Sequence, residues 1–356
     1  MNPFVLRVAV LVLLPVPPAL PAAQAQADSG AFVVRLGVDT IGMERYHRSG
    51  DRIEITVLGR SPRTVVRRAV LWLAPDGSVS RVATGAEGQP LEERANPQPG
   101  TIPVLGGSWI PWQLVLQRAR AAATDTTTVT VLAGGSPRPT PVRRTGPDRF
   151  ALANQFDQAM AARVDEQGRL LQAELAGGGT SVERVAGLDL ARWTREFSER
   201  DARGSGLGPL SPVDSASAVV QGARISVGYG RPSLRGRPLD VLAPPGEVWR
   251  MGANDATVLT TDRAVRFEGL RLAPGSYSLF AVPGREGWTL IVNRQTGISG
   301  LERNPAQDLG RVPMRTRRDA AHTERFTIEV RPEAGRGALT VRWGPVEAVA
   351  RFEVES

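Results

Sequence analysis

Short runs in which apolar and polar residues alternate recur along most of the chain, with turn residues between them. In the first half such runs cover residues 32–38, 52–58 and 65–73. Successive side chains of a β-strand point to opposite faces of a sheet, so this alternation predicts strands with one buried face. The Pro-Asp-Gly turn at 75–77 is typical of the short connections in an antiparallel meander. We therefore predict a mainly β protein.

Two segments of the first half break this alternation. Residues 108–123 begin with Ser108, a suitable N-cap, and residues 188–199 carry Leu190, Trp193 and Phe197 at helical spacing. Both segments are predicted to be helices packed on the sheet. The Pro-rich stretch at 136–147 is expected to be a long loop, with a further boundary as the alternative.

A single linker-like segment divides the chain. Residues 201–217, DARGSGLGPLSPVDSAS, are rich in Gly, Ser and Pro and have no apolar periodicity, as expected of a linker. The roughly 330 residues after residue 27 also exceed the size at which single cores usually stop growing. We predict an N-terminal β-rich domain at 28–200, a linker at 201–217 and a C-terminal domain at 218–356.

The C-terminal part has regular strand and turn signals. Alternation recurs around residues 225–229, 277–281, 326–330 and 339–343, and a Gly-rich hairpin at 283–287 precedes another apolar run. Such spacing predicts a β-sandwich. The fold class we expect is mainly β: a C-terminal antiparallel β-sandwich preceded by an N-terminal antiparallel β-meander or half-barrel with one or two helices.

The first 27 residues have the layout of a signal peptide. Arg7 precedes an apolar run at 8–16, and small residues at 23–27 follow it, with cleavage expected after Ala25 or Ala27. The apolar run is too short to cross a bilayer core of about 30 Å, so we expect no transmembrane segment after cleavage. The chain has no cysteine, which excludes disulfides and a lipid-modified N-terminal cysteine. We predict a periplasmic or secreted protein.

The charge balance is basic but dispersed. The chain has 44 basic residues, all arginine, against 36 acidic ones, giving a net charge of +8. A basic balance can indicate nucleic acid, anionic lipid or an acidic glycan as partner. Because no basic helix with interleaved aromatic residues and no zinc-finger spacing accompanies the arginines, we expect no nucleic-acid partner. The partner classes that the sequence leaves are a small molecule, a glycan or a lipid.

The layout of the N-terminal part resembles the half-barrel of periplasmic lipoprotein carriers and related envelope lipid-binding proteins. Long strands are followed by one inserted helix and a second set of strands. The resemblance implies that the concave face holds an apolar ligand, with Trp109 and Trp112 at one edge. The alternative is that both tryptophans belong to an ordinary core.

Several motifs of the C-terminal part occur in an order that resembles a secreted bacterial family, domain of unknown function 2911. These motifs are ISVGYGRPS at 225–233, 235–237, VWRMGANDAT at 248–257, APGSYSLFAVPG at 273–284 and DLGRVP at 308–313. The resemblance implies an exported β-rich domain and brings no agreed activity. Arg235 stands where the family usually has lysine, and residues 241–246 depart from its pattern, which argues against a lysine-dependent chemistry there.

The same motifs supply the candidate binding residues. Arginine offers a planar fork of donors for carboxylate or phosphate, and tryptophan offers a stacking face for a sugar or a cation. Loops between strands can gather these groups into a polar pocket for an anionic or hydroxylated ligand. The alternative is internal pairing, with Trp249 in the core and Asn254 capping a turn. The candidate residues are Arg231, Arg237, Trp249, Arg250, Asn254 and Asp255.

Catalytic signals are few. His47 and His322 are the only histidines, and no Gly-x-Ser-x-Gly elbow is present, so the sequence predicts no metal site, no cofactor and no serine nucleophile. Glu247 and Asp255 are the acid–base candidates beside the arginine motif. We expect a ligand- or partner-binding module of the cell envelope. The alternatives are a hydrolase acting on envelope polysaccharide through these two carboxylates, or a purely structural envelope module.

Overall fold

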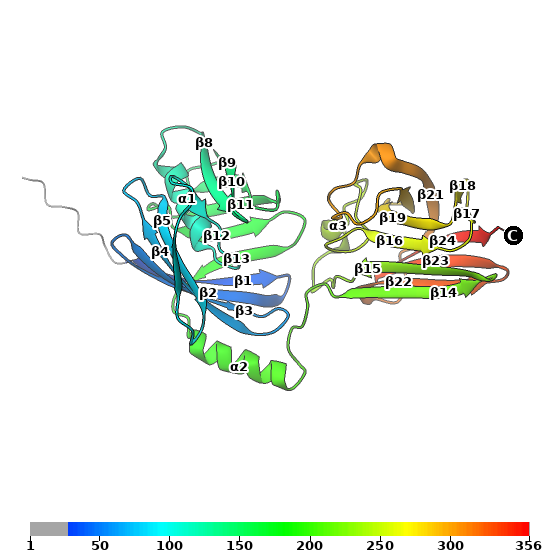
Figure 1. Cartoon of the computed structure of the whole chain (residues 1–356), viewed down its shortest axis with the longest axis horizontal. Helices are drawn as coiled ribbons and strands as arrows, with labels where there is room; N and C mark the ends of the chain where they lie inside the picture. Colours follow the sequence, from blue (N-terminus) through cyan, green and yellow to red (C-terminus); the bar gives the residue numbers. More distant parts are fainter. Residues whose placement is uncertain (1–27, 356) are drawn as a thin grey trace, which may run out of the picture.

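The computed structural model describes residues 28–355, in which strands form two separate antiparallel sheets (Figure 1). The mainly β fold class is thus confirmed. The predicted leader at 1–27 lies outside the described residues. Within the described range, none of the helices is long and apolar enough to cross a membrane.

The N-terminal sheet has thirteen strands, and almost every strand pairs with the next one along the chain. The last strand, β13, returns to pair with β1, so the sheet curves into a half-barrel (Figure 1). This is the predicted meander. The strands are β1 (Asp28–Leu36), β2 (Asp39–Ser49), β3 (Arg52–Gly59), β4 (Val65–Leu73), β5 (Val79–Ala86), β6 (Glu92–Ala95), β7 (Ile102–Pro103), β8 (Thr126–Ala133), β9 (Ser136–Arg144), β10 (Arg149–Ala153), β11 (Ala159–Val164), β12 (Leu170–Leu175) and β13 (Thr180–Val185).

Strand β9 corrects the expectation of a long loop at 136–147. Its prolines at 137, 139 and 141 occupy alternate positions, so they remove backbone N–H groups from one edge of the strand only. The opposite edge pairs with β8 from Ser136 to Arg143, whereas pairing with β10 is confined to Arg143 and Arg144. The regular spacing of the prolines is therefore compatible with a strand.

Both predicted helices are present, on opposite faces of the N-terminal sheet. Helix α1 (Ile110–Ala121) lies on the concave face, where Trp112, Leu116 and other side chains join the core. Helix α2 (Leu190–Ala202) packs on the convex face through Leu190 and Phe197. The concave face is thus occupied by the protein's own helix, which leaves less room for a ligand than an open half-barrel would.

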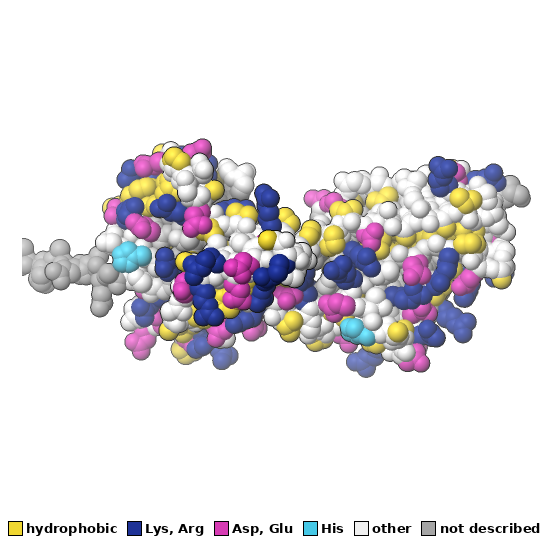
Figure 2. Space-filling view, turned by 90° about the horizontal axis from the view of Figure 1, so that it is seen from below, with side chains coloured by type: hydrophobic (Ala, Val, Ile, Leu, Met, Phe, Trp, Pro, Cys, Tyr) yellow, Lys and Arg dark blue, Asp and Glu magenta, His cyan; other side chains and the backbone are white. Residues whose placement is uncertain are grey.

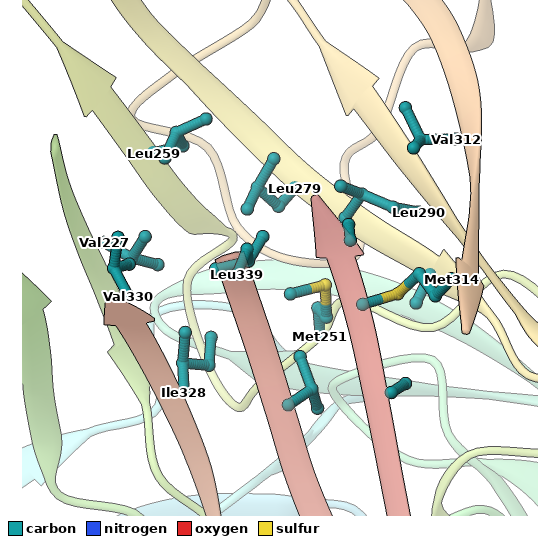
Figure 3. Close-up of a cluster of buried hydrophobic side chains, with 14 of the residues drawn as sticks. Val227, Met251, Leu259, Leu279, Leu290, Val312, Met314, Ile328, Val330 and Leu339 are labelled. Carbon is teal, nitrogen blue, oxygen red and sulfur yellow. The ribbon is translucent and has the colours of Figure 1, made fainter. Parts of the chain in front are cut away.

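The C-terminal sheet has eleven strands and folds over itself as a sandwich around one core, shown in part in Figure 3. The alternating residues predicted to be strands lie in β15, β19, β22 and β23, and their apolar side chains point into this core. The elements are β14 (Val213–Val220), β15 (Ala223–Gly230), α3 (Leu239–Leu242), β16 (Thr257–Thr261), β17 (Val265–Phe267), β18 (Leu270–Leu272), β19 (Gly275–Val282), β20 (Trp288–Asn293), the 3-10 helix η1 (Pro305–Gln307), β21 (Asp308–Arg317), β22 (Thr323–Glu333), β23 (Arg336–Gly344) and β24 (Val346–Val354).

The connection between the sheets is shorter than the predicted linker at 201–217. Helix α2 continues to Ala202, and β14 begins at Val213 and pairs with β15 along its length. In β14, serines alternate with Ala216 and Ala218, which pack on the core. The small residues that suggested a linker therefore form an edge strand, because their alternation is still that of a half-buried strand.

Two hairpins of the N-terminal sheet contact the C-terminal sheet. The backbone N–H of Val38, between β1 and β2, donates to the carbonyl oxygen of Arg235 at 3.0 Å. The Arg235 guanidinium forms an ion pair with Asp39. The Arg237 guanidinium donates to the carbonyl oxygen of Gly178, between β12 and β13. These contacts join the two sheets at the same end of the half-barrel.

Candidate functional site

Arg231 is engaged entirely inside the C-terminal sheet. Its Nη1 pairs with Asp214 of β14 at 3.0 Å, Nε donates to the carbonyl oxygen of Phe326 at 3.1 Å, and Nη2 donates to Thr327 at 3.0 Å. The side chain therefore joins β14, β15 and β22. A guanidinium whose donors are already used in this way has little left for a ligand.

Arg237 belongs to the contact between the two sheets. Besides Gly178, it donates to the carbonyl oxygens of Leu234 at 2.8 Å and Ser233 at 2.6 Å. Its side chain also lies directly over Gly179, at a position that a Cβ atom would occupy. Burial, together with the nearby charge of Arg235, lowers the pKa of Arg237. This arginine holds two loops together, and its place in the motif is explained by that role.

Trp249 lies in the core of the sandwich. Its ring stacks on Trp343 with centroids 5.2 Å apart, and Phe326 and Trp288 contact it edge-on at 5.0 and 5.8 Å. Its backbone exchanges hydrogen bonds with Ala281 of β19. The indole is therefore packed among aromatic rings and does not present a stacking face to a ligand.

Arg250, Asn254 and Asp255 are the candidate residues that the structure does bring together. All three lie next to the loop at 298–301. There the N–H of Gly300 donates to the carbonyl oxygen of Asn254 at 2.9 Å, and the backbone of Asp255 forms an isolated antiparallel β-bridge with Ser299. Asn254 adopts a left-handed backbone (φ 64°), which turns its exposed side chain outward before β16 begins. The predicted six-residue cluster is thus reduced to a group of three.

The half-buried Arg250 has an unusual environment. Its aliphatic stem packs against Gly300, which leaves no room for a larger residue there. Among the described residues its guanidinium makes neither a hydrogen bond nor an ion pair, whereas most neighbouring arginines of the motif do both. Burial alone lowers the pKa of Arg250, because no carboxylate nearby opposes it. The five donors of this guanidinium are therefore available to an anionic group.

The two acid–base candidates are both exposed. Glu247 and Asp255 lie on the surface, and within the described chain neither forms an ion pair with an arginine. A pair of catalytic carboxylates needs different environments to hold one protonated and the other ionised. Exposure of both residues supplies no such difference.

A second candidate site lies at one end of the half-barrel, where the N-terminal core is not closed and which we call the open end. This end also carries the two hairpins that contact the C-terminal sheet. A cavity of about 250 Å³ is bordered by Val34 of β1, Val57 of β3 and the residues at 104–109 that lead into α1. The core of this sheet has five partly buried apolar side chains at its margin, and all five line the cavity. They are Ile41, Val104, Leu105, Trp109 and Leu175.

Trp109 and Trp112 both line this cavity, but they differ in burial. Trp112 is only 3% exposed and is part of the core, whereas Trp109 is partly exposed at the margin. The sequence left open whether the two tryptophans edge a ligand site or belong to the core. The structure assigns Trp112 to the core and places Trp109 between the core and solvent.

Glu44 positions this end of α1 and was not foreseen from the sequence. Its carboxylate accepts hydrogen bonds from the Ser108 hydroxyl at 2.7 Å and the Trp109 N–H at 2.6 Å, at the start of the helix. Burial raises the pKa of Glu44 to about 7, although these hydrogen bonds favour the charged form. The sequence did contain one signal. Glu44 lies two residues before Tyr46, so the alternation of β2 points both side chains inward and places a carboxylate among apolar side chains.

Comparison with known proteins gives a family for one part of the chain. Residues 211–352, which form most of the C-terminal sheet, match the family described as protein of unknown function (DUF2911), as the motifs predicted. No curated protein matches the chain.

Two solved structures are similar only at a low level. A DUF1089 family protein from Pseudomonas aeruginosa has 13% identity and a TM-score of 0.31, covering 37% of this chain and 89% of its own. MucB in complex with MucA(peri) has 11% identity and a TM-score of 0.13, covering 92% of this chain and 88% of its own. Scores this low support no conclusion about fold or function.

Proposed function

We propose that this protein, whose C-terminal sheet matches a family without an assigned activity, is an exported binding protein that takes an apolar ligand at the open end of its half-barrel. The observation that carries the proposal is the incomplete closure of the N-terminal core. All the partly buried apolar side chains at the margin of that core line one cavity. Ligand sites are typically concave, mostly apolar and furnished with a few polar groups.

The rim of the cavity supplies such polar groups. Asn154, Gln155 and Gln158 lie on the β10–β11 turn beside Phe156, whose ring is 65% exposed. The buried Oε1 of Gln155 has no hydrogen-bond partner within the described chain. A ligand with an apolar body and one hydroxyl or amide group would satisfy this acceptor while covering the Phe156 ring. The size of the cavity favours a small molecule or the end of a longer chain.

The proposal can be tested with N-phenyl-1-naphthylamine, an uncharged dye that fluoresces in apolar sites. We expect saturable binding to the full chain and at least tenfold weaker binding to Leu105→Glu, because a charge in the wall makes an apolar ligand unfavourable. The matched control is Val219→Glu, which places the same charge at an exposed valine on β14. Equal binding by Leu105→Glu and the original protein, with both folded by circular dichroism, would refute this site.

A second candidate function is recognition of an anionic group by Arg250. The observation that favours it is the half-buried guanidinium without an acceptor among the described residues, next to the exposed Asn254 side chain. A carboxylate or phosphate there would accept hydrogen bonds from Arg250 and approach the Asn254 amide. Stabilisation of about 2.7 kcal/mol is expected at a ligand concentration a hundredfold above the dissociation constant. A thermal-shift titration with citrate that is unchanged in a folded Arg250→Gln variant would exclude this role.

The export of the protein is part of the proposal and rests on the sequence. The layout of residues 1–27 supports a leader that is removed after Ala25 or Ala27. N-terminal sequencing of the protein recovered outside the cytoplasm is expected to begin at Gln26 or Asp28. An intact Met1 end on protein that stays in the cytoplasm would contradict export.

A further inference from the structure

A hollow of about 700 Å³ lies on the convex face of the N-terminal sheet, away from the cavity at the open end. Its floor is formed by β1, β2 and β3, and the chain at 186–188 borders it before α2 begins. Figure 2 views the molecule from the side of α2 and shows basic side chains over this half, with acidic ones among them. The hollow belongs to neither of the sites proposed above.

The hollow forms because β1 presents small side chains to this face. The strand pairing places Ser29, His47 and Glu54 in one row across β1, β2 and β3. The next row contains Ala31 and Arg45, with Thr56 beyond them. The long side chains of Arg45 and His47 on β2 thus lie beside the short side chains of Ser29 and Ala31 on β1, which leave a depression in the surface.

Helix α2 covers only part of the convex face. Its side chains Leu190 and Phe197 pack on Val33, Met43 and other residues further along the strands. The preceding segment leaves the two rows uncovered, so their polar groups face the hollow. The strand sequence matches this division, because β1 is apolar at Val33 and small at Ala31 and Ser29.

Among the charged side chains of the lining, arginines outnumber carboxylates. Arg45 is exposed and has no acidic partner in the described chain, and residues 1–27 contain no Asp or Glu that could pair with it. His47 Nδ1 lies 2.8 Å from the Ser29 hydroxyl. Glu54 is the one carboxylate among the lining residues, and it already forms an ion pair with Arg52.

Two further arginines stand at the border of the hollow. Arg184 and Arg169 share Asp28 as a partner, with N–O distances of 3.5 Å. The Arg184 guanidinium lies over Gly30, where a Cβ would meet it, and Nη2 donates to the Tyr46 hydroxyl at 2.7 Å. Both side chains are fixed by these contacts, and Arg184 lies on the concave side of the sheet, where it also donates to Gln113 of α1. The free positive charge of the hollow is therefore that of Arg45.

We propose that this hollow binds an anionic group, a phosphate or carboxylate, through Arg45, His47 and Ser29. Arg45 supplies the charge and a fork of donors, and the serine hydroxyl and the imidazole supply further hydrogen bonds. Ala31 leaves the space that the anion occupies. Glu54 marks one limit of the site, since its carboxylate repels an anion at that end of the row.

The test titrates the full chain with inorganic phosphate by isothermal calorimetry at low ionic strength, where charge interactions are least screened. We expect saturable binding that Arg45→Gln weakens about tenfold or more and His47→Gln weakens less. Arg94→Gln is the matched control, because Arg94 is exposed on the distant strand β6. Phosphate has no apolar part, so the result does not depend on the cavity at the open end.

The outcomes separate this site from Arg250. Loss of binding in Arg45→Gln, with binding kept in Arg250→Gln and Arg94→Gln, supports the hollow. Loss in Arg250→Gln alone would overturn it and support the C-terminal site instead. Equal weakening by all three variants would show attraction by net charge only, and no saturable binding to the original protein would also overturn the proposal.

Discussion

The two sheets close their cores in different ways. In the C-terminal sandwich, Trp249 packs against Trp288, Trp343 and Phe326, so the core is sealed by aromatic rings. In the N-terminal half-barrel a helix fills the concave face, and the core stays open at one end beside Trp109. Tryptophan side chains thus close the core of one sheet and border a cavity in the other.

The largest expected effect is on the sealed core. Trp249→Ala removes the ring that all three other aromatic side chains contact, and we expect the free energy of unfolding of the C-terminal sheet to fall by about 3–5 kcal/mol. Calorimetry measures this loss. If the predicted two domains fold independently, the transition of the N-terminal sheet stays in place. A loss below about 1 kcal/mol would contradict the central role of this ring.

The next effect concerns the helix that fills the half-barrel and depends on pH. The pKa of Glu44 is about 7 in the folded chain against its usual 4.5, so the folded state keeps a proton that the unfolded state releases between these values. The stability that this bound proton contributes is fully present below pH 4.5 and is lost as the pH rises through 7. The loss in free energy of unfolding amounts to about 3 kcal/mol.

Glu44→Gln isolates this contribution. Denaturant unfolding of the original protein between pH 4.5 and 8 is expected to show a decline that the glutamine variant lacks, because glutamine does not titrate. The variant is less stable at low pH as well, since its amide cannot accept as many hydrogen bonds at the start of α1. Parallel curves for the two proteins would show that Glu44 keeps an ordinary pKa.

A smaller effect is expected at the open end. Trp109→Ala removes a partly exposed ring, so it costs about 1–2 kcal/mol, less than the buried Trp249. The backbone N–H of residue 109 still donates to Glu44 in this variant. Urea unfolding of Trp109→Ala and of Trp249→Ala compares the two losses in free energy of unfolding. A cost equal to that of Trp249→Ala would mean that the open end is sealed in solution.

The sequence predicts the strands well because their signal is local. The alternation at 225–229 and 339–343 lies in β15 and β23, and Leu190 and Phe197 lie in α2 as their spacing predicted. Strand β9 was missed because proline normally breaks strands, and only pairing with β8 shows that one edge stays intact.

The candidate site was less predictable than the fold. Proximity in sequence suggested that Arg231, Trp249 and Arg250 share a pocket, but neighbouring residues of a strand or loop point in different directions. Arg231 faces β22, Trp249 faces the core, and Arg250 lies beside Gly300. The partners that decide these roles, Phe326 and Gly300, are distant in the chain, so the motif alone could not identify them.

The smallest effect is expected where the two sheets meet. Asp39→Asn removes the charge that pairs with Arg235, and because the carboxylate is about one-third exposed the cost is below about 1 kcal/mol. The backbone hydrogen bond between Val38 and Arg235 remains, so both sheets stay folded. The connection at 203–212 is expected to become more accessible, and limited proteolysis of the variant measures this. Unchanged cleavage would show that the backbone contact and Arg237 hold the two sheets together without the ion pair.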